Sequence, residues 1–77
     1  MDKVLVLCIA EVTRRYGYST SRYQDSVMIE AEFEDQVKPT FDYHFGKIHR
    51  RDPAILEWKL VSYLPQQPLK KGKRVFH

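Results

Sequence analysis

Apolar and polar residues alternate with a period of two along most of the chain. Residues 4–10, VLVLCIA, form a continuous apolar run, which is typical of a strand buried on both faces. Residues 26–35 and 40–45 alternate between the two classes, so each segment predicts a strand with one buried face. Pro39, just before the second of these segments, is compatible with the start of a strand.

The segment that follows Asp52 supports two interpretations. Asp52 and Pro53 form a favourable helix start, with aspartate as the N-cap and proline in the first turn. Farther on, Leu56, Trp58 and Leu60 alternate with less apolar residues, which favours a strand over residues 56–63. We therefore predict a strand here, and keep as the alternative an α+β fold with a helix at about residues 53–64.

The predicted fold is mainly β, an antiparallel meander of four or five strands in one domain over residues 1–77. Closure or strong twisting into a small barrel-like sheet would protect the edges of such strands. Because the chain contains no asparagine, it has no Asn-Gly turn, and we expect hairpin loops longer than two residues. Residues 66–77 are expected to be a loosely attached basic tail, with RVFH as a short terminal strand or docked end.

Charge is segregated along the chain although the formal net charge is only +3. Residues 25–35 contain five acids and no lysine or arginine. Residues 13–24 contain three arginines and no acid, and residues 47–51 contain three further cations. The surface should therefore have one acidic zone and several basic ones.

Basic and tyrosine side chains occur in two segments that a meander would bring together. The loop after the first strand (13–25) and the loop after the third (47–53) would emerge at the same end of the sheet. Arginine neutralises phosphates, and tyrosine offers a flat face for an unpaired base. The predicted nucleic-acid-binding residues are Arg14, Arg15, Tyr16, Tyr18, Arg22, Tyr23, Lys47, Arg50 and Arg51. Single-stranded RNA or DNA is expected rather than duplex, because the predicted fold has no helix for the major groove.

The basic stretch also has a purely structural interpretation. The first strand can continue through Val12, Arg14 and Tyr16 into a twisted two-stranded arm on which the tyrosines pack. Charged loops of this kind also keep small β proteins in solution.

A protein partner is the main alternative to nucleic acid. Glu30, Glu32 and Glu34 alternate with apolar residues and would form an acidic stripe that could dock a basic protein. In that case the chain would be an accessory subunit or an inhibitor of a larger intracellular complex, of the kind that mobile elements encode. The sequence does not indicate an oligomeric state.

The chain lacks a recognisable catalytic, cofactor or metal-binding pattern. Asp42, His44 and His49 do not have the ligand spacing of a known zinc class, so we expect no metal, no cofactor and no enzymatic activity. Cys8 is the one cysteine, and its apolar neighbours indicate a buried thiol in a reducing compartment. We therefore expect a cytoplasmic protein that does not cross a membrane.

Overall fold

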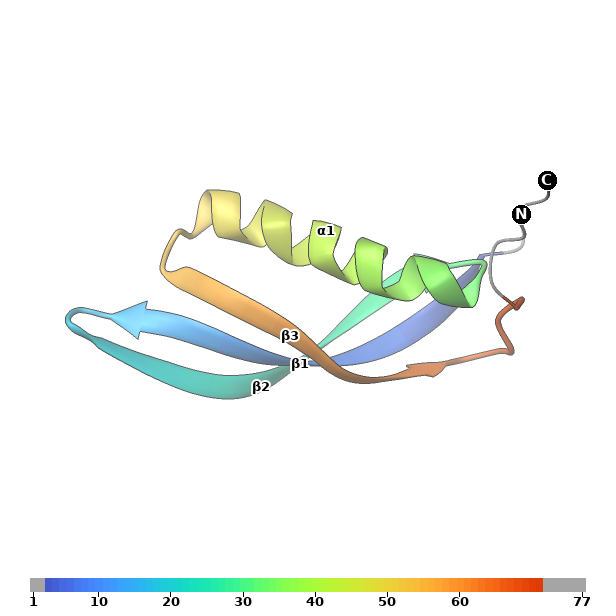
Figure 1. Cartoon of the computed structure of the whole chain (residues 1–77), viewed down its shortest axis with the longest axis horizontal. Coiled ribbons are helices and arrows are strands. Elements are labelled where there is room, and N and C mark those ends of the chain that lie inside the picture. The colour runs from blue at the N-terminus through green and yellow to red at the C-terminus, as the bar shows by residue number, and fades with distance from the viewer. Residues whose placement is uncertain (1–2, 72–77) are drawn as a thin grey trace.

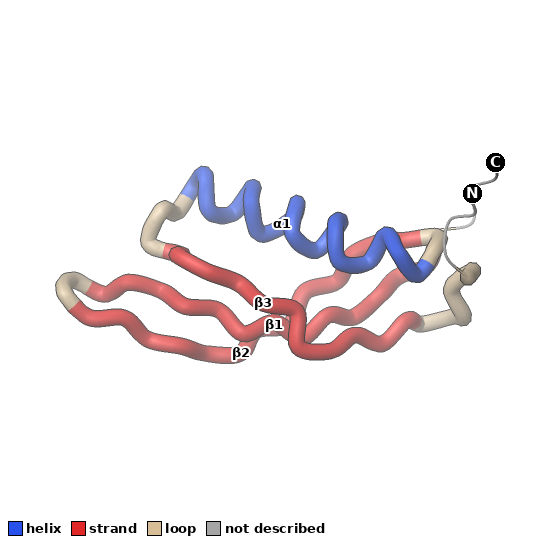
Figure 2. The backbone as a smooth tube through the Cα atoms, viewed as in Figure 1, coloured by secondary structure: helices blue, strands red, loops and turns tan. Residues whose placement is uncertain are grey.

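The computed structural model describes residues 3–71, which form a three-stranded antiparallel sheet and one α-helix (Figure 1). In chain order the elements are β1 (Val4–Tyr16), β2 (Ser19–Ala31), the 3₁₀ helix η1 (Glu34–Gln36), α1 (Val37–Arg51) and β3 (Ile55–Pro65). The strand order is β2-β1-β3, so β1 is central and each of its neighbours is an edge strand. Figure 2 shows α1 lying along one face of the sheet.

The mainly-β, antiparallel character of the prediction is confirmed, but its topology is not. The described residues contain three strands in an open sheet rather than four or five strands in a barrel-like one. The α+β alternative fits this architecture, although its helix was expected in the wrong place. Residues 53–64 lie mostly in β3, as the alternation around Trp58 predicted, and the helix spans Val37–Arg51.

The strand predicted over residues 40–45 is wrong because the alternation there is only apparent. Val37, Phe41 and Phe45 are four residues apart and form one buried stripe on α1. Tyr43, which completes the apparent period of two, is 63% exposed on the outer side of the helix. Phe41 and Phe45 fit both the period of a strand and the period of a helix. The exposure of Tyr43 is what distinguishes the helix from the strand.

The start of α1 is compatible with Pro39 and is fixed by Gln36. Pro39 lies in the first turn, where a missing backbone N–H removes no helical hydrogen bond. The Gln36 Oε1 atom accepts hydrogen bonds from the backbone N–H groups of Glu32 (2.9 Å) and Phe33 (3.1 Å). These bonds connect the end of β2 directly to the beginning of the helix.

The hydrophobic core lies between α1 and one face of the sheet. Its buried residues are Val6, Cys8, Ala10, Val12, Ile29, Ala31, Val37, Phe41, Phe45 and Ile55. Even-numbered residues of β1 supply the central row, and the aromatic rings of the helix cover it. Phe45 stacks on Trp58 of β3 with ring centroids 6.0 Å apart. Burial raises the pKa of the Cys8 thiol, which keeps that side chain neutral within the core.

β1 and β2 are joined by a two-residue turn, so the expectation of longer hairpin loops is wrong. The two strands pair without interruption from Val4↔Ala31 to Tyr16↔Ser19, which leaves only Gly17 and Tyr18 unpaired. Gly17 has φ +62°, and a glycine at the first turn position is the signature of a type II′ hairpin. The relevant sequence signal was therefore this glycine, not the absent asparagine.

The chain after β3 remains attached to the sheet as far as it is described. Gln66 donates a backbone hydrogen bond to Leu5, and Lys70 forms a bridge with Phe33 and an ion pair with Glu32 (2.9 Å). The predicted terminal strand RVFH lies outside the described residues. Within residues 3–71, no helix combines the length and the hydropathy needed to cross a bilayer.

Replacing Phe45 with alanine should strongly destabilise the protein. Phe45 is fully buried and contacts Phe41, Trp58 and His44, and removing such a ring costs about 3–5 kcal/mol. Urea denaturation followed by the fluorescence of Trp58 measures this change. Tyr43→Ala, on the exposed side of the same helix, is the matched control and should change the free energy of unfolding by less than about 1 kcal/mol. Equal losses in the two variants would contradict the assignment of the buried face.

Candidate nucleic-acid interface

The basic stretch identified in the sequence forms the projecting end of the β1–β2 hairpin. β3 pairs with β1 only as far as Arg14↔Ile55, so residues 15–20 continue as a two-stranded ribbon. We call residues 15–22 the arm. All eight of its residues are exposed, and Figure 1 shows this end of the hairpin extending past the helix. The stretch is therefore not a loop. It continues the strands of the hairpin, as the structural interpretation of the sequence expected.

The alternation of strands places the predicted binding residues on two faces of the hairpin. Tyr16 and Tyr23 lie on the side of the sheet that carries the helix, because they share that side with the buried Val12. Arg15 and Arg22 lie on the opposite side. Tyr18 occupies the turn and is fully exposed. The nine predicted residues therefore do not form one flat patch.

An ion pair attaches the base of the arm to the end of α1. The Arg14 guanidinium donates a hydrogen bond to the carboxylate of Asp52, which immediately follows the helix. This hydrogen bond raises the pKa of Arg14, so the side chain remains charged. The backbone N–H of Arg15 donates to the carbonyl of Ala54 at 2.8 Å. Arg14 is thus occupied by a protein carboxylate, which makes it a structural residue rather than a free phosphate ligand.

The two basic segments meet at one end of the molecule, although by a different topology from the one expected. Residues 47–51 form the last turns of α1 instead of a loop. Because the helix runs back over the sheet, Arg50 and Arg51 lie at the same end as the base of the arm (Figure 1). Lys47 lies apart from them over the ring of Tyr43, with Nζ 4.9 Å from the ring centroid. Cations in the last turn of a helix also stabilise its dipole.

The acidic stripe expected for a protein partner is divided in the structure. Glu30 is exposed on β2, whereas Glu32 follows the end of that strand and pairs with Lys70. Glu34 begins η1, and its backbone N–H donates to the carbonyl of Lys70. Because β2 ends at Ala31, the three carboxylates do not continue along one strand face.

His44 and His49, the two histidines within residues 3–71, each contact an aromatic side chain. The Nδ1 atom of His49 donates a hydrogen bond to the carbonyl of Ile55 at 2.6 Å, and its ring lies 5.8 Å from that of Trp58. His44 contacts Phe45 edge-on. The part of the chain described by the structure contains no group of three side chains suited to a metal ion.

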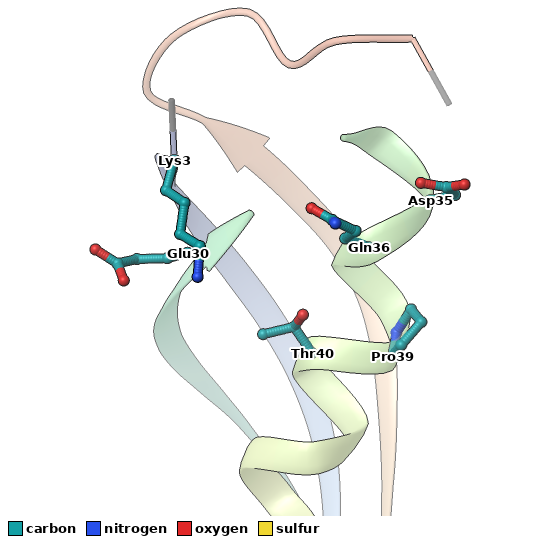
Figure 3. Close-up of a pocket in the computed structure, with 6 residues that line it drawn as sticks. All are labelled: Lys3, Glu30, Asp35, Gln36, Pro39 and Thr40. Atoms are coloured by element: carbon teal, nitrogen blue, oxygen red, sulfur yellow. The ribbon is translucent and has the colours of Figure 1, made fainter. Parts of the chain in front are cut away.

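A hollow lies between the edge of β2 and the beginning of α1 (Figure 3). It is lined by Lys3, Glu30, Asp35, Gln36, Pro39 and Thr40. It combines the carboxylates of Glu30 and Asp35 with the amine of Lys3, the side-chain amide of Gln36 and the hydroxyl of Thr40.

Sequence reasoning missed the face of the sheet that lies opposite α1. This open face carries charged residues near the arm, where a hollow is lined by Glu11, Thr13, Arg22, Glu57, Trp58 and Lys59. Farther from the arm it carries apolar residues, including Leu5, Met28 and Leu64. The signal for the apolar part was the run VLVLCIA, whose composition indicated burial on both faces.

No protein-family model matches the chain, and neither the curated proteins nor the solved structures include a significant match to it.

Replacing Asp52 with alanine should loosen the base of the arm without unfolding the protein. The change removes the acceptor of Arg14 and a contact with the backbone N–H of Ala54, so the bond from Arg15 N–H to Ala54 should open more often. Faster hydrogen exchange at the Arg15 amide, measured by NMR, is the expected result. Asp42→Ala removes an exposed ion pair with Lys38 and serves as the control. Unchanged exchange at Arg15 in Asp52→Ala would show that the ion pair does not hold the arm.

Proposed function

We propose that the protein binds single-stranded nucleic acid through the arm and the adjoining end of α1. The observation that carries this proposal is the arm itself. Its two-stranded part, residues 15–20, is exposed at every residue and contains Arg15, Tyr16 and Tyr18 but no acid, and Arg22 follows on β2. Such a surface favours a polyanion with flat, accessible bases.

Phosphate contacts come from the exposed cations that form no ion pair with another described residue. Arg15 is exposed and lies beyond the last residue pair of β1 with β3. Arg50 and Arg51 are exposed at the end of the helix. Arg22 is less available to phosphates. Thr13 of the central strand pairs with Arg22 on β2 and with Glu57 on β3, so the carboxylate lies on the same face of the sheet as the guanidinium.

Base contacts come from the tyrosines. Tyr18 is fully exposed at the turn and Tyr16 is 55% exposed on the strand before it. Rings in these positions can stack on unpaired bases, whose faces are accessible only in single strands. A two-stranded ribbon also fits the major groove of a duplex, but the tyrosines would then have no base face to stack on. Single strands therefore use more of this surface than a duplex does.

Replacing Arg15 or Tyr18 with alanine should weaken binding in different ways. Arg15→Ala removes one phosphate contact, so the slope of log affinity against log salt should fall by about 0.7. Tyr18→Ala should cost about 1–3 kcal/mol of binding free energy and leave that slope unchanged, because stacking releases no counterions. The measurement is a salt titration of fluorescence anisotropy with a labelled single-stranded oligonucleotide.

Lys38→Ala is the matched control for charge. It removes one positive charge at the opposite end of α1, where Lys38 pairs with Asp42, and should leave both affinity and slope unchanged. An equal effect of Lys38→Ala and Arg15→Ala would indicate general attraction by net charge and contradict a site on the arm. Absence of binding by the wild-type protein at low salt would end the proposal. Tighter binding to the duplex form of the same oligonucleotide would show that the ribbon enters a groove instead.

A further inference from the structure

The apolar half of the open sheet face has no covering layer among the described residues. Odd-numbered residues of β1 point to this face, since the even-numbered ones point to α1. The neighbours of Leu7 continue the apolar surface onto both edge strands, whereas Ile9 lies between two serines and Leu5 lies beside Glu30. We define the open-face patch as Leu5, Leu7, Ile9, Met28 and Leu64. Leu64 is 62% exposed, and Leu5 and Met28 are each about half exposed.

This exposure conflicts with the composition of β1. A continuous apolar run is typical of a strand buried on both faces, and α1 buries only one face of it. The patch is also contiguous across three strands, and such surfaces on small proteins mark interaction sites. A second layer on this face would complete the burial that the sequence of β1 indicates.

The open face is complementary to itself. A two-fold axis parallel to β1 places β2 of one copy over β3 of the other, and each row of residues then faces the same row of its partner. In the row of Leu7, Met28 meets Leu64 of the second copy; in the next row Ser26 meets Ser62. In these two rows apolar residues therefore meet apolar residues and hydroxyls meet hydroxyls, and Glu30 lies at the margin of the face, beside Leu5.

The charges on this face follow the same symmetry. In the row of Thr13, Arg22 lies on β2 and Glu57 on β3, so the axis places the Arg22 of each copy over the Glu57 of the other. No ion pair joins these two residues within one described chain. Glu11 meets its own copy on the axis, but Lys59 is its direct neighbour on β3 and offsets the repulsion.

We propose that two copies of the chain pack their open faces together into a two-fold symmetric dimer, with the patch at its centre. This proposal does not depend on nucleic-acid binding. The face from Leu5 to Thr13 measures about 30 Å by about 14 Å, given the usual spacing of residues and strands. Two such faces have a combined flat area of about 840 Å², which corresponds to a weak dimer at the lower end of the interface sizes. Aligned packing of two sheets is the arrangement found in β-sandwiches.

The patch is tested by placing a charge at its most exposed position. The wild-type chain should dimerise at micromolar concentrations in sedimentation equilibrium, and Leu64→Lys should raise the dimer dissociation constant by at least about tenfold. Tyr43→Lys is the matched control, because Tyr43 is 63% exposed but lies on the outer side of α1. It should leave the dissociation constant unchanged. A wild-type chain that stays monomeric at several hundred micromolar would overturn the proposal.

The pairing of Arg22 with Glu57 is tested by exchanging the charges between copies. Arg22→Glu and Glu57→Arg should each weaken the dimer by about tenfold or more, because each places like charges opposite one another. An equimolar mixture of the two variants restores both ion pairs in the mixed dimer and should return to within about threefold of the wild-type dissociation constant. An ion pair within one chain could not be rescued by mixing. Folded single variants that dimerise like the wild type, or a mixture without recovery, would overturn the proposed dimer.

Discussion

Contact between α1 and the even-numbered side chains of β1 holds the two layers of the protein together. Val6, Cys8, Ala10 and Val12 are fully buried under the helix, and no charged side chain of residues 3–71 is buried with them. Because strand side chains alternate, this contact also determines where the odd-numbered residues point. A shift of the hairpin register by one residue would bring leucines into the core and expose the small residues that fit beneath the helix.

The length of the covering helix determines how much of the hairpin belongs to the core. α1 ends at Arg51, and the connection through Asp52 returns the chain to β3 beside Arg14. Beyond this point β1 pairs only with β2, and an isolated two-stranded hairpin is marginally stable in water. Arg14–Asp52 and the bond from Arg15 N–H to Ala54 lie at the boundary. They hold the base of the arm while leaving its side chains free for a partner.

The sequence predicted β3 and the apolar parts of β1 and β2, where the pattern of side chains agrees with their packing. Residues 13–25 were expected to be a loop, but all of them except Gly17 and Tyr18 are paired in the hairpin, because strand pairing there does not require an apolar face. The prediction also failed at residues 40–45, where Phe41 and Phe45 fit a period of two and a period of four equally well. Their partners in space decide the matter: Val37 and Trp58 contribute to the same core, whereas Tyr43 has no core contact. The end of the sheet at which the cations gather was anticipated. The sequence did not predict that these cations are divided between two faces of the hairpin, because that division depends on how far β1 extends before Gly17.

The central claim is that the core folds independently of the arm and that the arm carries the binding surface. A shortened chain that lacks Arg15, Tyr16, Ser19 and Thr20 tests it most directly. In the shortened chain the turn Gly17–Tyr18 connects Arg14 directly to Ser21, which are already a pair of the hairpin. Because two residues are removed from each strand, every remaining side chain stays on the same face of the sheet. The melting temperature and the salt-dependent affinity for a single-stranded oligonucleotide should be measured on the same sample. We expect cooperative unfolding within about 5 °C of the wild-type midpoint and an affinity at least about tenfold weaker, because Arg15 and Tyr16 are lost while Tyr18 and the end of α1 remain. A shortened chain that fails to fold, or one that folds and binds as tightly as the wild type, would contradict this account.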